Sequence, residues 1–165
     1  MKIILRKLKL RQEEAAYFTY NGPLEDDFLP EGTAAIDGPV SINIVIKRQD
    51  KAYYGQGSLE TAILYTCSRC LTKFVQPLVL DLAMVFQEKD DETEYAEEVI
   101  PLINDEADIK PYIEGVIFAE LPLSPVCRTD CQGLCPACGN DKNTGSCVCR
   151  VDDIDPRWEK LKKYK

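Results

Sequence analysis

The sequence predicts an α+β fold, in which an antiparallel β-sheet meander packs against one helix and a C-terminal cysteine-rich zinc module follows. Three long neighbouring segments alternate apolar and polar residues, which is the spacing of strands with one buried face. A later segment has apolar residues at helical spacing, and six of the eight cysteines lie between Cys127 and Cys149. We therefore expect an α+β body over residues 1–126 with a central C-x-x-C knuckle, a zinc-binding module over 127–150 and a basic tail over 151–165.

The three alternating segments cover residues 40–47, 52–66 and 74–86. In the first of them, Val40, Ile42, Ile44 and Ile46 share one face, and polar residues such as Ser41 and Asn43 point to the other face. The connections between the segments are too short for crossover helices, so we expect neighbouring strands to run antiparallel.

The segments outside these strands are less regular. Residues 2–20 are partly alternating and β-prone, residues 24–38 are typical of a loop or edge connection, and residues 99–103 form a short apolar piece. Residues 88–98 hold seven acids against the single base Lys89. Such a charge run predicts a solvated loop without a function of its own.

Residues 108–121 are expected to form the helix that packs on the sheet. Asp108 can cap its N-terminus, Pro111 is tolerated in its first turn, and Pro122 and Pro125 end it. Its apolar stripe consists of Ile109, Ile113, Val116 and Ile117.

The cysteines give the most specific chemical signal. Two pairs, Cys67-Ser-Arg-Cys70 and Cys135-Pro-Ala-Cys138-Gly139, have the spacing of a zinc knuckle, in which both sulfurs point to one metal centre. The sequence contains no histidine, so a metal site must be all-cysteine or include an oxygen ligand. The remaining candidate ligands are Cys127, Cys131, Cys147 and Cys149.

Eight sulfurs suffice for two four-cysteine sites, and one division of them is the simplest. Cys135, Cys138, Cys147 and Cys149 are close in sequence, which leaves Cys67, Cys70, Cys127 and Cys131 to attach the module to the body. Other divisions stay open. We expect two structural Zn²⁺ ions, because full sulfur coordination leaves no position for a substrate. A structural zinc contributes roughly 10–16 kcal/mol of apparent binding free energy, which suits a module with too few apolar residues to be stable by burial.

Other uses of the cysteines compete with zinc. No segment has the length of a membrane span or the pattern of a signal peptide, so we expect a cytoplasmic protein, in which disulfides are rare. A thioredoxin-like pair would sit at a helix N-terminus, whereas Cys67 and Cys70 lie between β-patterned segments. An iron–sulfur cluster stays open from spacing alone, although Pro136 and Gly139 favour zinc. A thiol-based redox or metal-sensing protein is therefore the alternative function.

Charge is distributed unevenly along the chain. The formal net charge is −8, but residues 1–11 contribute +5 and residues 157–165 contribute +4, so the middle of the chain carries −17. An acidic body argues against coating nucleic acid or an anionic membrane, whereas a few basic groups can contact RNA locally. Trp158, Tyr53 and Tyr54 could stack on bases, although packing is the simpler role for them. The candidate RNA contacts are Arg69, Lys73, Arg128, Lys142, Arg150, Arg157, Lys160, Lys162 and Lys163.

The sequence has no pattern of a catalytic site. It contains no histidine, no Gly-rich phosphate loop and no nucleophile elbow. We therefore expect a binding protein with no small-molecule substrate, and not an enzyme.

Three motifs together resemble a known family. Leu121-Pro-Leu-Ser-Pro-Val-Cys127 is followed by Cys131-Gln-Gly-Leu-Cys135-Pro-Ala-Cys138-Gly-Asn-Asp141-Lys-Asn143, and upstream stands Cys67-Ser-Arg-Cys70-Leu-Thr-Lys-Phe74. With the closing Asp155-Pro-Arg157 and Leu161, this combination resembles the YceD family of large ribosomal RNA subunit accumulation proteins. The resemblance implies a bacterial or organellar protein needed for accumulation of 23S rRNA and large-subunit assembly. The expected partner is 23S rRNA or its precursor, or a large-subunit ribosomal protein.

Overall fold

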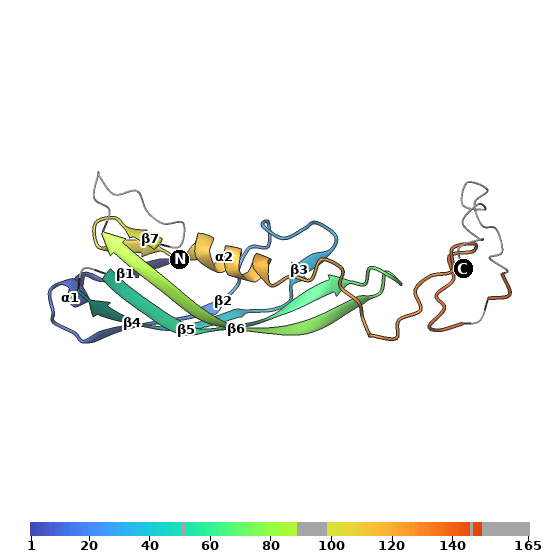
Figure 1. The fold of residues 1–165 in the computed structure, drawn as a ribbon, viewed down its shortest axis with the longest axis horizontal. Coiled ribbons are helices and arrows are strands. Elements are labelled where there is room, and N and C mark those ends of the chain that lie inside the picture. The colour runs from blue at the N-terminus through green and yellow to red at the C-terminus, as the bar shows by residue number, and fades with distance from the viewer. Residues whose placement is uncertain (51, 89–98, 146, 150–165) are drawn as a thin grey trace, which may run out of the picture.

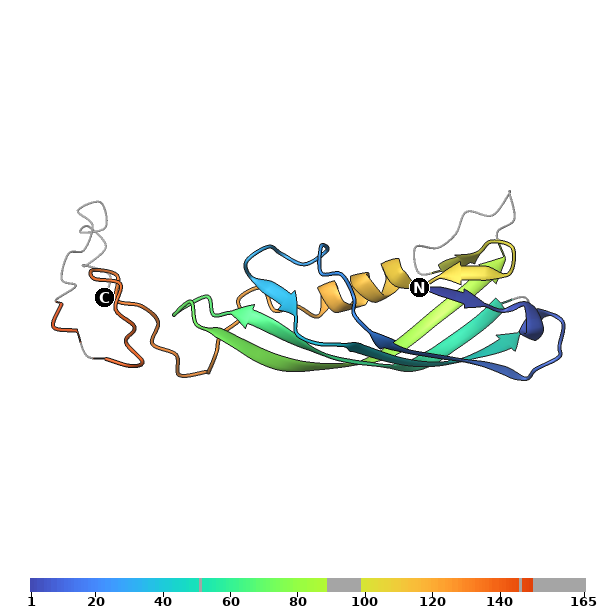
Figure 2. The same cartoon turned by 180° about the vertical axis from the view of Figure 1, so that it is seen from behind.

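The computed structural model describes residues 1–50, 52–88, 99–145 and 147–149, and its centre is a long antiparallel β-sheet. The three central strands are β4 (Val40–Gln49), β5 (Ala52–Thr66) and β6 (Lys73–Glu88), and they pair antiparallel with one another in that order. Figures 1 and 2 show them as one elongated, curved layer. The strands predicted from alternation are therefore confirmed, and the second and third extend to 15 and 16 residues.

The edges of the sheet differ from the sequence prediction. β2 (Ala15–Gly22) pairs antiparallel with β4, whereas β7 (Val99–Leu102) pairs parallel with β6, so the sheet is not a pure meander. β3 (Ala34–Ile36) lies in the segment expected to be a loop. It pairs with β5 next to the place where β4 begins. These strands are short or at an edge, where pairing depends on tertiary neighbours more than on alternation.

The N-terminal segment also departs from the expected β pattern. β1 (Lys2–Ile4) pairs with β8 (Glu106–Asp108) in a separate two-stranded sheet, and a short helix, α1 (Arg6–Lys9), follows β1. Leu8 is buried in α1, so this helix closes one end of the core.

The predicted packing helix is present as α2 (Lys110–Ala119), which is shorter than the expected 108–121. Asp108 still stabilises the first turn of the helix, because Asp108 Oδ1 accepts a hydrogen bond from the backbone N–H of Lys110 at 3.0 Å. Pro111 lies in the first turn, as expected. The predicted stripe is confirmed, with Val116 half-buried and the isoleucines fully buried: Ile109, Ile113 and Ile117.

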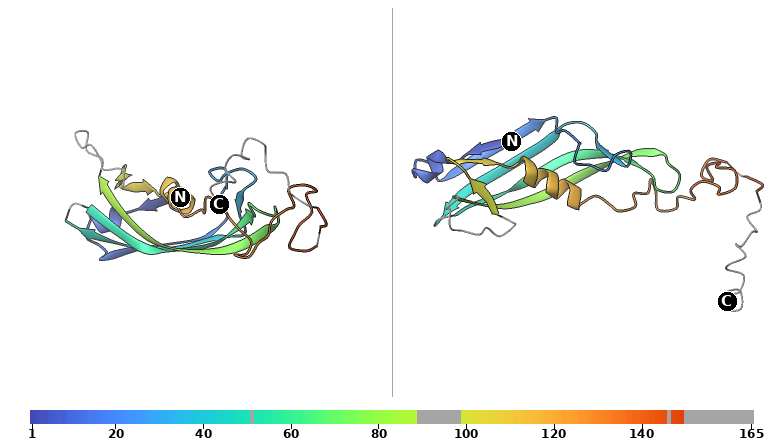
Figure 3. Two further views of the ribbon diagram at one scale, coloured as in Figure 1. Left: turned by 45° about the vertical axis from the view of Figure 1, so that its right-hand side comes forward. Right: turned by 90° about the horizontal axis from the view of Figure 1, so that it is seen from above.

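The core lies between the concave face of the sheet and a cover made of α2, β1 and the 24–36 segment (Figure 3). Inward side chains of β4, β5 and β6 meet there in register, as in the row Ile42, Leu59 and Leu80. Gly57 allows a very close strand approach, since a Cβ atom there would clash with the backbone of Asn43. The opposite face is open, and Tyr17 is 79% exposed on it.

Beyond α2 the chain runs past the tip of the β5–β6 hairpin to the cysteine-rich segment (Figures 1 and 3). In the part of the chain that the structure describes, no helix has the length and apolar character needed to cross a membrane. The predicted tail over 151–165 and most of the acidic 88–98 run lie outside the described residues.

Candidate metal centres

The first cysteine pair forms the tip of the β5–β6 hairpin. The strands pair up to Thr66 and Lys73, and the turn between them is closed by a 2.9 Å bond from the Cys67 N–H to the Thr72 carbonyl. Ser68 joins the tip to the segment after α2, since both its N–H and its hydroxyl donate to the Pro125 carbonyl, at 2.8 and 3.0 Å. This contact brings the next two cysteines of the chain to the same place.

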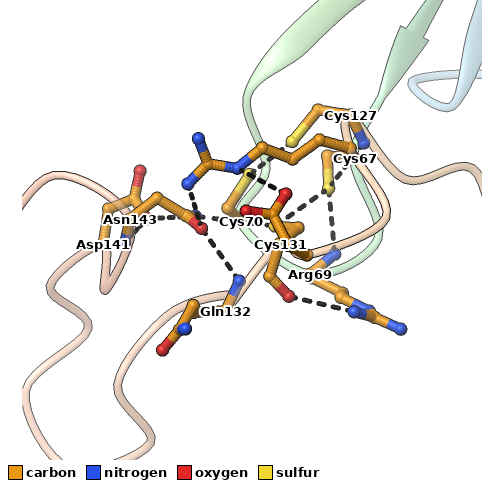
Figure 4. A network of polar contacts seen from close by, with 10 residues as sticks. Cys67, Arg69, Cys70, Cys127, Cys131, Gln132, Asp141 and Asn143 are labelled. Carbon is orange, nitrogen blue, oxygen red and sulfur yellow. Dashed lines mark hydrogen bonds and ion pairs between the residues drawn. The ribbon is translucent and has the colours of Figure 1, made fainter.

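Four sulfurs meet at this tip: Cys67, Cys70, Cys127 and Cys131 (Figure 4). All four lie within 4.8 Å of one another, with Cys67 and Cys131 sulfurs 3.9 Å apart and Cys70 and Cys127 sulfurs 3.6 Å apart. Four sulfurs bound tetrahedrally at about 2.3 Å from one metal ion lie about 3.8 Å apart. A disulfide would require about 2.05 Å, so the spacing fits a four-sulfur metal site and not a disulfide.

Backbone groups are aimed at one of these sulfurs. Cys67 Sγ accepts N–H bonds from Arg69 and Cys127, both at 3.4 Å. Burial alone would raise the pKa of Cys67, but these donors, with that of Cys70, lower the pKa to about 6. Burial and the neighbouring thiols Cys70, Cys131 and Cys67 raise the pKa of Cys127 to about 12. Four negative sulfurs this close repel one another, and a dication at their centre would remove that repulsion.

An asparagine from further along the chain completes the surroundings of the first cluster. The Asn143 side-chain N–H₂ donates to Cys131 Sγ at 3.5 Å and to Asp141 Oδ1 at 2.6 Å. Its side-chain oxygen accepts from Arg128 and from the Gln132 backbone N–H, both at 2.8 Å (Figure 4). Both amide protons and the amide oxygen are thus used, so Asn143 fixes Cys131 to the loop that carries the second cluster.

Arg69, between the first two ligands, also holds the module against the hairpin. Its guanidinium donates to the Cys131 carbonyl at 2.9 Å, and its own carbonyl accepts the Leu134 N–H at 3.0 Å. Gly133 passes so close that an added Cβ would lie 2.9 Å from the Arg69 carbonyl oxygen. Hydrogen bonds from both the side chain and the backbone of Arg69 therefore attach the C-terminal segment to the body, beside the point where the four sulfurs meet.

The second cluster contains the thiols of Cys135, Cys138, Cys147 and Cys149, again within 4.8 Å of one another. Backbone N–H groups of Cys138 and Ala137 lower the pKa of Cys135 to about 6, whereas the neighbouring Cys138 thiol raises that of Cys149 to about 11. Cys135 is buried, but Cys138 and Cys149 are exposed. The structure thus brings the eight cysteines together in the two quartets that the simplest sequence division predicts.

The two C-x-x-C turns have the same backbone geometry. The Leu71 N–H bonds to the Cys67 carbonyl at 3.0 Å, and the Gly139 N–H bonds to the Cys135 carbonyl at 2.8 Å. The residue after the second cysteine is left-handed in both, with φ of 61° at Leu71 and 74° at Gly139. This conformation is free for glycine but costs about 1–2 kcal/mol for other residues. The sequence predicts the tight turn at Gly139 but gives no sign of it at Leu71.

The predicted RNA contacts fall into three groups. The guanidinium groups of Arg69 and Arg128 are engaged within the protein, the latter with Asn143 and with Asp130 at 3.4 Å. Lys73 and Lys142 form no ion pair with any residue that the structure describes. The rest lie outside the described residues: Arg150, Arg157, Lys160, Lys162 and Lys163.

The aromatic residues considered for base stacking differ in how exposed they are. Tyr53 is buried, with 2% of its surface exposed, and packs under Arg48, so it is a core residue. Tyr54 is 44% exposed on the open face of the sheet, and Trp158 lies outside the described residues.

Comparison with known proteins identifies the family. A family model described as "Large ribosomal RNA subunit accumulation protein YceD" matches residues 55–165, which is more than half of the chain and includes most of β5, all of β6 and α2, and all eight cysteines. The chain belongs to the YceD family. This confirms the resemblance that the cysteine motifs carry.

Relatives of the chain include bacterial and plant proteins. An uncharacterized protein of Mycobacterium tuberculosis is 36% identical over 110 residues, covering 64% of this chain and 52% of that protein. A chloroplastic large ribosomal RNA subunit accumulation protein YCED homolog 1 of Zea mays is 27% identical over 147 residues, covering 70% of this chain and 50% of that protein. The Arabidopsis thaliana protein of the same name is 25% identical over 161 residues, covering 80% and 49%.

This YceD-family chain spans about half the length of the curated relatives it matches. No solved structure matches it.

Proposed function

We propose that the protein is a non-enzymatic factor that supports accumulation of 23S rRNA and assembly of the large ribosomal subunit. The observation that carries this proposal is membership of the YceD family. The plant homologues, which are named large ribosomal RNA subunit accumulation proteins, support it. The expected mode of action is binding to 23S rRNA or its precursor, or to a large-subunit ribosomal protein. We expect this to take place in the bacterial cytoplasm or the corresponding organellar compartment.

Each cysteine quartet is proposed to hold one structural Zn²⁺ ion. The donor set supports zinc, because four thiolates with sulfur separations of 3.6 and 3.9 Å suit a tetrahedral ion that prefers sulfur. Zinc bound by four sulfurs supplies no open coordination position, so its contribution would be to hold the fold together. The residues around the first quartet would orient its ligands: the Arg69 and Cys127 N–H groups point at Cys67, and Asn143 points at Cys131.

Metal analysis of the protein purified under reducing conditions tests the cofactor. We expect about two equivalents of zinc per chain and no iron. A reduced protein that is fully folded yet free of metal would contradict the structural role.

A partner test separates RNA from protein. We expect the full chain to associate with large-subunit precursors in cell extracts fractionated by size. If it contacts RNA directly, affinity for protein-free 23S rRNA falls steeply with salt, because Lys and Arg contacts release counterions. Reversing the charges of the basic tail should then flatten that slope. No binding to protein-free 23S rRNA at low salt would favour a ribosomal protein as the partner.

The alternative, a thiol-based redox or metal-sensing protein, is favoured by one observation. Cys138 and Cys149 of the second quartet are exposed to solvent, where a thiol reagent could reach them. Titration with such a reagent before and after chelation discriminates between the two functions. Thiols that react only after chelation support structural zinc, whereas rapid reaction of the zinc-loaded protein supports a sensor.

A further inference from the structure

We propose that the open face of the sheet, where β2, β4 and β5 lie side by side, binds single-stranded RNA through Tyr17, Tyr54 and Lys47. The two tyrosine rings stack on bases, and the lysine contacts phosphate. The proposal rests on the assembly role proposed above and deepens it, because it names RNA as the partner and assigns the surface that contacts it.

The strand register places these three side chains in one cluster. Lys47 lies directly opposite Tyr54 on β5 and opposite Ala15 on β2, and Tyr17 is two residues further along β2. Side chains directly opposite each other have Cβ atoms about 4.5–5.5 Å apart, and diagonal neighbours lie about 7–8 Å apart. All three project from the face opposite the buried Ile46, and Figures 1 and 2 show α2 and β1 on the other, concave side.

Neither tyrosine serves the fold through its side chain. Tyr17 and Tyr54 are 79% and 44% exposed, and their side chains form no hydrogen bond or ring contact with any residue that the structure describes. Tyr112 is different, because its hydroxyl donates to the Ala83 carbonyl at 2.6 Å. An exposed aromatic ring without such a role can stack on any base, whatever the RNA sequence.

A hollow of about 800 Å³ opens beside Tyr54 on this face. Its lining includes the bases Lys47 and Arg48 and no acid. The side-chain amides of Gln49 and Gln56 also line it, and amides can both donate to and accept from the edge of a base. The hollow therefore combines the groups that contact a phosphate, a base face and a base edge.

The two bases of the hollow keep their charge uncompensated by ion pairs. Neither Lys47 nor Arg48 forms an ion pair within the described part of the chain. The Arg48 guanidinium instead donates to the backbone carbonyls of Lys9 and Asp50, at 2.7 and 3.2 Å. The lining of the hollow thus carries +2 from side chains that the structure describes, and phosphate is the complementary charge.

The nearest acids do not reverse this charge. Glu14 and Asp50 lie beside Arg11 at the margin, and Glu13 is paired with Lys7 at 3.0 Å. With the two bases of the hollow, three bases stand against two unpaired acids, which leaves +1.

The acids of the open face itself lie further away. Glu60 and Asp81 are nearer the hairpin tip, and Asp81 is four residues along β6 from Val85, the partner of Tyr54. Four residues of a strand span about 13 Å, which exceeds the Debye length of about 10 Å at 0.1 M salt. Phosphate at the cluster is therefore screened from these carboxylates.

The combination of rings and positive charge favours a single strand. Duplex RNA keeps its base faces inside the stack, whereas an unpaired strand offers them to aromatic side chains. A basic protein surface would be repelled by this cluster. An acidic protein surface would not, and docking of such a surface is one outcome of the test.

The test uses the full chain with its metal bound as purified. Tyr17→Ala and Tyr54→Ala remove the rings, the matched Tyr17→Phe and Tyr54→Phe keep them, and Lys47→Gln removes the charge. Val79→Ala is the control on the same face, because Val79 is 66% exposed on β6 and lies opposite Glu60, away from the cluster. The probes are a short single-stranded RNA, an RNA duplex of the same length, protein-free 23S rRNA and individually purified large-subunit ribosomal proteins.

We expect each tyrosine-to-alanine variant to bind the single strand roughly 5- to 150-fold more weakly, because stacking on one aromatic ring contributes that much per base. The phenylalanine variants and Val79→Ala should bind like the parent, and the duplex should bind more weakly than the single strand. Lys47→Gln should reduce the slope of log affinity against log salt by about 0.7, the value for one phosphate of a single strand. Ultraviolet cross-linking of the bound parent should attach RNA to the peptides that carry Tyr17 and Tyr54. Urea unfolding midpoints and zinc content should not change.

Equal binding of the single strand by the alanine variants and the parent would overturn the proposal, as would cross-links that fall only elsewhere. An alanine variant that unfolds at lower urea would show that its ring serves the fold, and that outcome also counts against the proposal. Weaker binding of a ribosomal protein with RNA binding intact would assign the face to a protein and overturn it too. A parent that binds no RNA at low salt yet associates with large-subunit precursors overturns this proposal alone. A parent that does neither removes the assembly role as well.

Discussion

The sheet and the cysteine-rich segment of this chain are stabilised by different means. Between the sheet and α2, side chains such as Ile42, Leu59 and Ile113 are completely buried, and burial of apolar surface stabilises this body. In the described part of the chain after Pro125, the buried side chains are Cys131 and Cys135, with Val126 and Leu134 half-buried beside the first quartet. Apolar contact thus stabilises the body, whereas metal bound to the sulfurs would have to stabilise the cysteine-rich segment.

The two regions meet at the tip of the β5–β6 hairpin. There Cys67 and Cys70 lie in the turn between β5 and β6, and their sulfurs belong to the first quartet. The inward-facing residues of the two strands belong to the apolar core. Metal at this point would tie the segment that lacks a core to the body that has one. The predictions below test how far the two regions depend on each other.

The largest effect is expected from removing ligands of the first quartet. Cys67→Ser combined with Cys70→Ser should abolish one of two bound zinc equivalents and release the Cys127 and Cys131 segment. A structural zinc contributes roughly 10–16 kcal/mol of apparent binding free energy, so the remaining ligands cannot compensate. Metal analysis with near- and far-ultraviolet circular dichroism measures this, and the β signal of the body should persist.

The control for that change lies in the second quartet. Cys147→Ser with Cys149→Ser should abolish the other equivalent and leave the first. Loss of both equivalents in either variant would mean that the centres are not separable, and loss of none would refute the division into these quartets.

The next effect is expected in the body. Ile113 is fully buried in α2, so Ile113→Ala leaves a cavity and should lower the free energy of unfolding by about 2–5 kcal/mol. Phe118→Ala in the same helix is the control, because Phe118 is 53% exposed and its removal should change little. Urea unfolding followed by metal analysis checks both. Zinc content that fell along with the stability of Ile113→Ala would show that the two regions are not independent.

The sequence predicts the parts of the molecule that carry a repeating signal. Alternation over 40–47, 52–66 and 74–86 located the central strands, and the isoleucines of α2 located its buried face, because each pattern extends over several residues. β3 and β7 have three and four residues, too few for a pattern, and the direction of β7 is set by its place beside β6.

In the candidate site, too, some residues could be predicted from the sequence and others could not. Cysteine spacing predicts the two quartets that the structure brings together, because each C-x-x-C turn places two sulfurs on one side and the remaining cysteines lie nearby in the chain. The groups that orient those ligands carry no such signal. Asn143 lies twelve positions from Cys131 and looks like an ordinary loop residue, and Arg69 looks like a surface base until its bonds to the module are seen.

A smaller effect is expected when the link between the two centres is cut. Asn143→Ala removes the donor to Cys131 Sγ and leaves the Gln132 N–H without its partner, whereas Asp141 keeps the bond from the backbone N–H of residue 143. Changes to such supporting groups lower metal affinity about 10–100-fold, so zinc should leave the first quartet faster. Competition with a chromophoric chelator measures the release. Asn140→Ala is the control, because Asn140 contributes its backbone carbonyl to Cys135 and its side chain is exposed.

The smallest effect concerns pH and the junction between β8 and α2. The Met1 ammonium and the Lys110 N–H both bond to Asp108 Oδ1, at 2.8 and 3.0 Å, and in that order they hold the pKa of Asp108 below its usual value of 3.8. The charged form is therefore favoured in the folded state, so this contribution to stability is complete well above pH 3.8 and is lost as the pH falls through and below that value. Because the Asp108 side chain is 54% exposed, solvent screening limits the contribution to under about 1 kcal/mol. Asp108→Asn should thus lower stability slightly at pH 7 and not at all near pH 2, as measured by urea unfolding at the two pH values. An equal loss at both pH values would show that the effect does not come from the charge of Asp108, which would contradict this prediction. Asparagine keeps the hydrogen bond from the Lys110 N–H, because its side-chain oxygen accepts the same bond without the charge.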